Sequence, residues 1–184
     1  MEFLSGLAGA GLRGAGGHLN RKAGDSRYHL SGLFTLKRTL YMEINTVGII
    51  GAGTMGNGIA QICAVSGVNV VMVDISDAAV QKGLATVAGS LDRLIKKEKM
   101  SEADKAAALA RIKTSTRYED LQAAQIVIEA ATENYELKLK ILKQVDAVVA
   151  PDVIVASNTS SISITKLAAA TSASTCLRIL SLSS

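Results

Sequence analysis

Three glycines and one aspartate have a spacing that suits the binding of phosphate and ribose groups. Gly51, Gly53 and Gly56 fit the pattern G-x-G-x-x-G, and Asp74 follows at about the 20-residue distance of the dinucleotide-binding pattern. Such glycines permit a tight turn, close approach of the backbone to a pyrophosphate and close packing of the next helix. A carboxylate accepts hydrogen bonds from a ribose and repels a 2′-phosphate. We therefore expect NAD rather than NADP.

These residues need a strand, a turn, a helix and a second strand to position them. Residues 46–50 and 69–73 are apolar enough for buried strands, and residues 54–65 are typical of a helix. The N-terminus of that helix, with free N–H groups and a positive dipole end, is expected to hold the phosphates. The predicted cofactor-binding residues of this unit are Gly51, Ala52, Gly53, Thr54, Met55, Gly56 and Asp74.

Strands and helices alternate through the following sequence. Helices are predicted over residues 77–99, 101–110, 134–149 and 164–170, and strands over 112–114, 125–129 and within 150–156. The first two helices form a hairpin, and Ser101 with Asp104 resembles a capping box. The alternation predicts an α/β fold: a doubly wound, mostly parallel sheet of Rossmann type with an inserted helical hairpin.

Three loops are expected to meet at the carboxyl ends of these strands, where such sheets bind ligands: residues 51–56, 129–138 and 157–161. The last loop reads Ser-Asn-Thr-Ser-Ser. Its hydroxyls and amide could orient a substrate oxygen or a nicotinamide. Ordinary turn and N-cap chemistry explains the same residue types, and the loop taken alone favours that explanation.

Residues 1–41 differ from the rest of the chain. Their six basic and two acidic residues account for the whole net charge of +4. They also hold half of the 16 glycines and both histidines, His18 and His29. We expect a disordered extension here, and the remainder gives no reason to propose nucleic acid. The extension is either a mitochondrial transit peptide or sequence that precedes a true start at Met42. Its glycines oppose an amphipathic helix and favour the second origin, hence a cytoplasmic protein rather than one of the mitochondrial matrix.

The composition argues against metal, disulfide and membrane chemistry. Cys63 and Cys176 lie far apart, and the sequence has no CxxC motif or metal-ligand cluster, which indicates a reducing compartment. The uncharged run between Glu43 and Asp74 is interrupted by glycines and polar residues, whereas a membrane helix needs about 20 predominantly apolar residues. A buried strand, helix and strand explains it better.

Four motifs between Thr46 and Thr171 match a known family in order and spacing: V-G-I-I-G-A-G-T-M-G-N-G-I-A-Q, V-V-M-V-D, V-I-E-A-A-T-E-N and A-S-N-T-S-S-I-S-I. This part of the chain resembles the NAD-binding domain of the 3-hydroxyacyl-CoA dehydrogenases, especially their bacterial 3-hydroxybutyryl-CoA branch. The resemblance implies reversible hydride transfer between C3 of a 3-hydroxyacyl-CoA and NAD, in fatty acid or butanoate metabolism. It also implies a homo-oligomer.

The same resemblance assigns residues that spacing alone does not. Glu133 and Lys138 fall on positions that line the NAD site. Ser160 falls on a serine that contacts both substrate and cofactor, and Ser90 and Lys97 fall on acyl-CoA contacts. Without the resemblance, Glu133 is a surface acid at a helix start, and Lys138 and Lys97 are solvated helix charges. The helical hairpin would cover the CoA end of the substrate.

The resemblance stops after Thr171. Counted from Ser160, the catalytic His of the family falls on Ser181, and its supporting Glu and C-terminal helical domain, which supplies dimer contacts, have no counterpart in residues 172–184. We expect an incomplete NAD-binding domain over 42–171 and an unrelated tail, as a frameshift or gene-model error would leave. Two hypotheses stay open. The chain is a truncated dehydrogenase with little activity, since general acid–base catalysis contributes about 10²–10⁴-fold, or it is a non-catalytic NAD-binding fragment.

Overall fold

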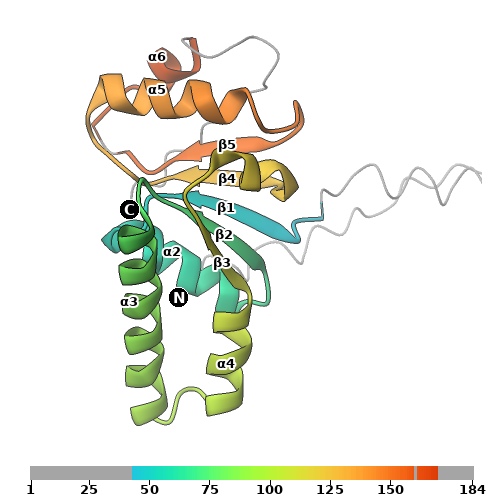
Figure 1. The fold of residues 1–184 in the computed structure, drawn as a ribbon, viewed down its shortest axis with the longest axis vertical. Coiled ribbons are helices and arrows are strands. Elements are labelled where there is room, and N and C mark those ends of the chain that lie inside the picture. The colour runs from blue at the N-terminus through green and yellow to red at the C-terminus, as the bar shows by residue number, and fades with distance from the viewer. Residues whose placement is uncertain (1–42, 160, 170–184) are drawn as a thin grey trace, which may run out of the picture. The chain divides into compact units, whose positions relative to one another are not determined.

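The computed structural model describes residues 43–159 and 161–169, which contain a five-stranded parallel sheet between two layers of helices (Figure 1). The strands are β1 (Thr46–Ile50), β2 (Asn69–Val73), β3 (Ile112–Ser115), β4 (Ile126–Glu129) and β5 (Ile154–Ser157). This confirms the predicted doubly wound α/β fold. The extension predicted over 1–41 and the tail predicted over 172–184 lie outside the described residues.

The strand order β3-β2-β1-β4-β5 places β1 at the centre of the sheet. Val47 of β1 pairs with Val70 of β2 on one side and with Ile126 of β4 on the other. The chain winds from β1 through β2 to β3 in one direction and then crosses to β4 and β5 in the other. A crevice outside the carboxyl ends of β1 and β4 is therefore expected, because ligands of open parallel sheets bind where the winding reverses.

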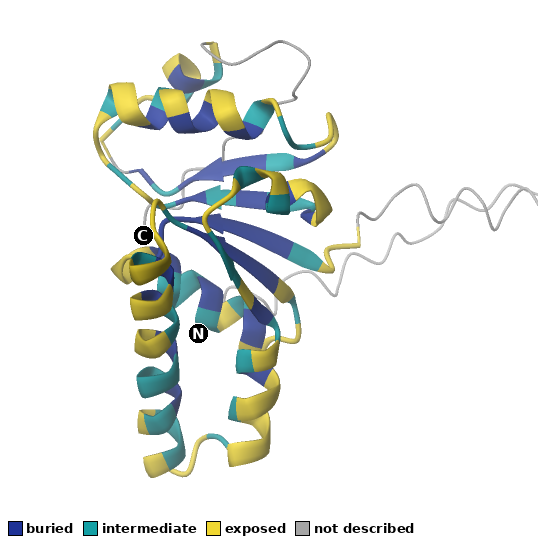
Figure 2. Cartoon of the chain, viewed as in Figure 1, coloured by how far each residue is buried: buried dark blue, intermediate teal, exposed yellow. Residues whose placement is uncertain are grey.

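The sheet separates two hydrophobic cores, and its central strands contribute to both. In β2, Val70 and Met72 pack into one core, whereas Val71 and Val73 pack into the other. Alternate residues of a strand face opposite sides, so a strand covered on both sides reads as a continuous apolar run. Figure 2 shows the buried sheet and the exposed outer sides of the helices.

The two cores are closed by different helices. The helices α2 (Thr54–Val65), α3 (Asp77–Lys96) and α4 (Glu102–Ala110) cover the first core. The 3-10 helix η1 (Tyr118–Ala123), with α5 (Tyr135–Asp146) and α6 (Ile164–Ala169), covers the second. The hairpin of α3 and α4 extends beyond the sheet (Figure 1). Its predicted capping box is confirmed, since Asp104 N–H donates to Ser101 Oγ at 3.0 Å and Ser101 N–H donates back to the Asp104 carboxylate.

Helix α3 ends at Lys96, whereas the sequence predicted a helix to residue 99. Glu98 adopts a positive φ of 56°, and the N–H groups of Glu98 and Lys99 bond back to the carbonyls of Ile95 and Leu94. These two bonds form a Schellman motif, which usually has glycine at the left-handed position. Glutamate at that position gave no sequence signal for a stop.

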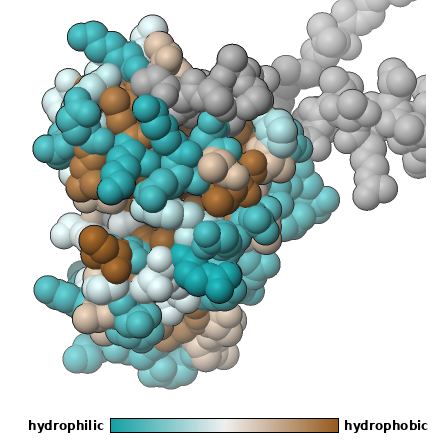
Figure 3. Space-filling view, turned by 45° about the horizontal axis from the view of Figure 1, so that its top comes forward, coloured by the Kyte–Doolittle hydropathy of each residue, from teal (hydrophilic) through white to brown (hydrophobic). Residues whose placement is uncertain are grey.

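The uncharged run before Asp74 forms β1, α2 and β2, which confirms the strand–helix–strand interpretation. None of the helices within residues 43–169 combines the length and apolar character needed to cross a bilayer. In that same range, no three His, Cys, Asp or Glu side chains gather as metal ligands would. On the face shown in Figure 3, hydrophobic patches are separated by hydrophilic atoms.

Candidate functional site

Two of the three glycines in the turn after β1 are required by the packing of the protein itself. Gly51 has a φ of 100°, and a Cβ there would lie 2.7 Å from the Ala130 carbonyl oxygen. A Cβ on Gly56 would lie 1.7 Å from the Gly51 carbonyl oxygen. Gly51 therefore makes the tight turn, as predicted, and Gly56 brings the first turn of α2 against the backbone of that turn.

Gly53 differs because a Cβ at this position would meet no atom within 4 Å. It is the N-cap of α2, with a φ of −69° that any residue tolerates, and no side chain of the described residues caps this helix. In contrast, Ser76, Ser101 and Asn134 cap α3, α4 and α5. The open space and uncapped N–H groups fit a pyrophosphate at the helix N-terminus. The binding role of Ala52, Thr54 and Met55 stays a prediction, and the Ala52 N–H is donated to Asp74.

Asp74 lies at the carboxyl end of β2 and holds the glycine turn. Its Oδ2 accepts a hydrogen bond from Ala52 N–H at 2.6 Å, and its Oδ1 accepts one from Ile75 N–H at 2.6 Å. Gly51 N–H also bonds to the Val73 carbonyl at 2.8 Å, so the turn is tied to β2 at two points. Each carboxylate oxygen has a further lone pair for a ribose hydroxyl.

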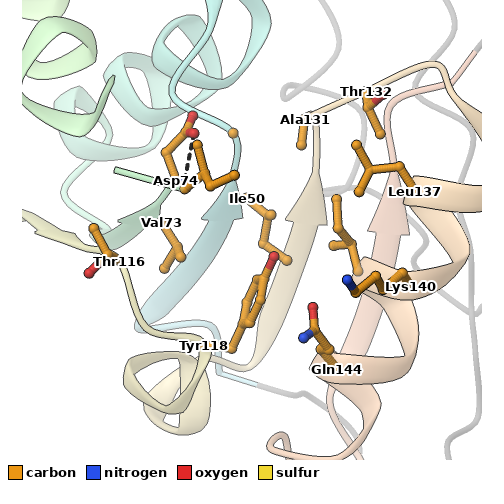
Figure 4. A pocket seen from close by; sticks show the side chains of 13 residues that line it. Ile50, Val73, Asp74, Thr116, Tyr118, Ala131, Thr132, Leu137, Lys140 and Gln144 are labelled. Carbon is orange, nitrogen blue, oxygen red and sulfur yellow. Dashed lines mark hydrogen bonds between the residues drawn. The ribbon is translucent and has the colours of Figure 1, made fainter. Parts of the chain in front are cut away.

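A pocket of about 370 Å³ opens beside Asp74 at the strand ends, and we call it the strand-end pocket (Figure 4). Ile50 and Val73 form its floor, and Tyr118 faces Lys140 and Gln144 across it. Its volume lies in the range of about 300–1,000 Å³ that is typical of small-molecule sites. An apolar floor with an aromatic wall suits a planar heterocycle.

A second pocket of about 300 Å³ lies on the other side of Asp74, and we call it the helix pocket. It is lined by Gly53 and Thr54 of the turn and by Lys82 and Thr86 of α3. Asp74 therefore stands between the two pockets and contributes to both. A ligand that runs past the glycine turn would meet this carboxylate midway.

The environment of Tyr118 is both buried and acidic. Burial raises the pKa of the Tyr118 phenol above its ordinary value, and the carboxylates of Asp74 and Glu129 raise the pKa further. The phenol therefore stays neutral at physiological pH, as a hydrogen-bonding wall of the strand-end pocket.

Glu133 joins the loop after β4 to the loop after β5. Its Oε2 accepts hydrogen bonds from Thr159 Oγ1 at 2.9 Å and from Ser161 Oγ at 3.1 Å. The predicted loops 129–138 and 157–161 do meet at the carboxyl edge of the sheet. Ser160 itself lies outside the described residues.

Lys138 is not the solvated charge that its sequence context suggested. Its side chain is 0 % exposed and forms an ion pair with Glu129, which is also 0 % exposed. Ser157 Oγ lies 3.2 Å from Lys138 Nζ and donates to Glu129 Oε2 at 2.7 Å. Lys138 thus lies beneath the strand-end loops, and its ammonium group faces the protein interior.

The two predicted acyl-CoA contacts lie along α3, away from the glycine turn. Ser90 is half-buried, and Lys97 is exposed at the C-cap. At 1.5 Å per residue, Lys97 lies about 30 Å along the helix from Asp77. The structure therefore brings together the residues of the glycine turn and Asp74, and separately Glu133 with the loop after β5, but it does not bring Ser90 and Lys97 to either group.

Several lining residues were not predicted from the sequence. Tyr118 belongs to η1, a 3-10 helix that no periodicity indicated. Leu137 of α5 is 48 % exposed and lines the strand-end pocket. The available signal for Leu137 was an apolar residue one helical turn before the buried Ile141. Lys82 and Lys140 carried no signal beyond their charge.

The strand order, the glycine turn and the acidic end of β2 define a dinucleotide-binding domain of the Rossmann type. The sequence matches the family described as "3-hydroxyacyl-CoA dehydrogenase, NAD binding domain" over residues 46–179. The chain belongs to this family, and NAD is the cofactor of the matched domain.

Similar proteins carry consistent names. The 3-hydroxybutyryl-CoA dehydrogenase of Bradyrhizobium diazoefficiens is 48% identical over 128 residues, which are 70% of this chain and 44% of that protein. The enzyme of the same name from Mycobacterium tuberculosis strain H37Rv is 41% identical over 129 residues, 70% of this chain and 45% of that protein. The crystal structure of (S)-3-hydroxybutyryl-CoA dehydrogenase PaaH1 from Ralstonia eutropha matches with 78% identity and a TM-score of 0.70, over 72% of this chain and 47% of that chain. The chain therefore spans about half the length of these relatives.

Proposed function

We propose that the chain is the NAD-binding part of an enzyme that oxidises (S)-3-hydroxybutyryl-CoA, or a close 3-hydroxyacyl-CoA, to the 3-oxoacyl-CoA. The observation that carries the proposal is the bond from Ala52 N–H to Asp74, which places a ribose acceptor beside the phosphate-binding turn. The substrate class comes from the names of the relatives. The proposed domain covers residues 42–171, followed by a tail over 172–184.

The chain has separate groups for each part of the cofactor. The N–H groups of the glycine turn would hold the pyrophosphate, and Asp74 would accept the ribose hydroxyls. The strand-end pocket between Tyr118 and Leu137 would take the adenine. Glu133 and Ser160 would lie toward the nicotinamide. Lys138 would act indirectly, because its buried ammonium group contacts Glu129 rather than open space.

The acyl-CoA would extend along the hairpin of α3 and α4. Ser90 and Lys97 are the proposed contacts on α3, together with Ser160 at the reacting end. Lys97 is exposed next to Lys96 and Lys99, and ammonium groups suit the phosphates of CoA.

The chemistry limits what this polypeptide does alone. When bound, the nicotinamide accepts the hydride from C3 of the substrate. The hydroxyl proton must leave as well, and a histidine most often accepts it near neutral pH. Both histidines of the sequence lie at positions 18 and 29, so residues 43–184 contain none. We therefore infer little turnover by the 184-residue polypeptide. The same observation supports the second candidate, a non-catalytic NAD-binding fragment.

One experiment separates these candidates. NADH oxidation by acetoacetyl-CoA is followed with the purified chain, first alone and then with the remaining half of the Ralstonia eutropha relative added as a separate polypeptide. We expect no turnover alone and measurable turnover after the addition. Robust turnover by the chain alone would contradict the proposed inactivity. If NAD binds but the added half restores nothing, the non-catalytic fragment is favoured.

A further inference from the structure

Two carboxylates tie the loop after β4 to the segment after β5, one inside the protein and one at its surface. Inside, Glu129 Oε1 accepts from Ala131 N–H at 2.9 Å, and Glu129 Oε2 accepts from Ser157 Oγ at 2.7 Å. At the surface, Glu133 Oε2 accepts from Thr159 Oγ1 and Ser161 Oγ. The two loops are thus linked both below and above.

The inner link uses a costly pair of charges. Glu129, Lys138 and Ser157 are each 0 % exposed. Replacing a buried ion pair by apolar residues of similar volume is often neutral or stabilising. The pair of Glu129 and Lys138 lies at the ends of β4 and β5. This position indicates a use beyond stability, which is to fix where the backbone leaves the two strands.

The outer link acts directly on the segment after β5. Thr159 is 3 % exposed, and its Oγ1 also accepts from Ile162 N–H at 3.3 Å. By holding Thr159, the Glu133 carboxylate therefore also restrains the chain that leads into α6. On the other side, Glu133 follows Ala131 and Thr132, which line the strand-end pocket and whose N–H groups bond to Glu129.

We propose that Glu129 and Glu133 are positioning residues that make the loop after β4 and the segment after β5 move as one unit. A ligand in the strand-end pocket, which Ala131 and Thr132 line, then restrains the segment of Thr159 and Ser161 through this linkage. The identity of the ligand as NAD rests on the proposed function, whereas the linkage between the two loops does not depend on it.

Backbone hydrogen exchange of the full chain tests the linkage without ligand. Glu133→Ala removes the outer acceptor, so exchange in the peptide spanning 157–162 should accelerate about fivefold, the factor for losing a hydrogen bond of ordinary strength. Glu133→Gln keeps an acceptor oxygen and should restore much of the protection. Glu136→Ala, at an exposed position in the first turn of α5, is the matched control and should leave this peptide unchanged. Equal exchange in wild type and Glu133→Ala overturns the proposal.

Repeating the measurement with saturating AMP separates positioning from simple stability, because AMP carries the adenine proposed for the strand-end pocket and lacks the nicotinamide proposed to lie toward Ser160. In the wild type, AMP should slow exchange in both loops. In Glu133→Ala, AMP should still slow the loop after β4 but no longer the peptide 157–162. Equal AMP protection of that peptide in both proteins overturns the positioning role. If the wild type binds no AMP, the proposed adenine site fails, while the ligand-free comparison still decides whether the loops are linked.

Discussion

The Asp74 carboxylate accepts a hydrogen bond from the backbone N–H of Ala52 at 2.6 Å. The bond joins the end of β2 to the turn that follows β1. It also places a negative charge between the strand-end pocket and the helix pocket. Phosphate donors and the ribose acceptor are therefore held in a fixed relation before any cofactor binds.

Asp74→Ala should weaken NAD binding and relax the choice between NAD and NADP. Hydrogen bonds to charged groups contribute about 1.5–3 kcal/mol, so calorimetry should show a loss of about 10- to 100-fold for NAD. NADP should lose less, because the repulsion of its 2′-phosphate disappears. Asp77→Ala removes an exposed carboxylate from the first turn of α3 and serves as the control. An unchanged NAD:NADP ratio in Asp74→Ala would refute the role of Asp74.

Substitutions of Gly53 and Gly58 should separate effects on NAD binding from effects on stability. Gly53→Ala meets no atom and needs no unusual φ, so it should unfold like the wild type but bind NAD more weakly. Gly58→Ala, within α2 and equally free of contacts, should stabilise the protein by about 0.5–1 kcal/mol with unchanged NAD affinity. Urea unfolding and calorimetry on both variants measure this. Normal NAD affinity in Gly53→Ala would show that the open space at Gly53 is not used.

Gly56→Ala should disrupt folding rather than NAD binding alone. Its Cβ would lie 1.7 Å from the Gly51 carbonyl oxygen, which is backbone and cannot turn aside as a side chain would. We expect a large drop in the urea midpoint or no folded protein. A variant as stable as Gly58→Ala would contradict the packing of α2 on the glycine turn.

Lys138→Met should strongly destabilise the protein because it leaves the buried Glu129 without its cation. Breaking a buried ion pair costs about 3–5 kcal/mol. The double variant Glu129→Gln/Lys138→Met removes both charges and should recover much of that loss. Lys143→Met, at an exposed position of the same helix, is the control. Urea unfolding of the four proteins gives the comparison, and a Lys138→Met loss as small as the control's would show that the pair contributes little.

Tyr118 should titrate above its ordinary pKa of 10.0, chiefly because it is buried. A phenol that ionises less readily when folded contributes stability that is complete below pH 10.0 and is lost as the pH rises through the folded-state pKa. The difference in tyrosinate absorbance between wild type and Tyr118→Phe isolates this group. In Asp74→Asn the pKa should move back toward 10.0, since a negative neighbour is removed. A Tyr118 pKa that does not respond to Asp74 would contradict their proximity.

The sequence was sufficient for features that depend on local pattern. Apolar runs and glycine spacing located β1, α2 and β2 with the bounds that the structure shows, and Asp74 at the end of β2. The capping box at Ser101 and Asp104 was equally local. Such features are readable because strand periodicity, turns and caps are set by residues close in sequence.

Features that depend on the sheet register were not predictable. Glu129, Lys138 and Ser157 meet only because β4 pairs with β5 in parallel, with Glu129 opposite Ser157. In sequence, Lys138 is one of several lysines on an amphipathic helix. Tyr118 lies in a short 3-10 helix without periodicity, and its place in the pocket follows from how η1 packs on the sheet.

The most direct test of the account is a calorimetric titration of the full chain with NAD and with NADP under the same conditions. The glycine turn, the uncapped α2 and Asp74 together predict that NAD binds, and that it binds more tightly than NADP. Equal or tighter binding of NADP, or no binding of either nucleotide, would contradict the assignment of this site.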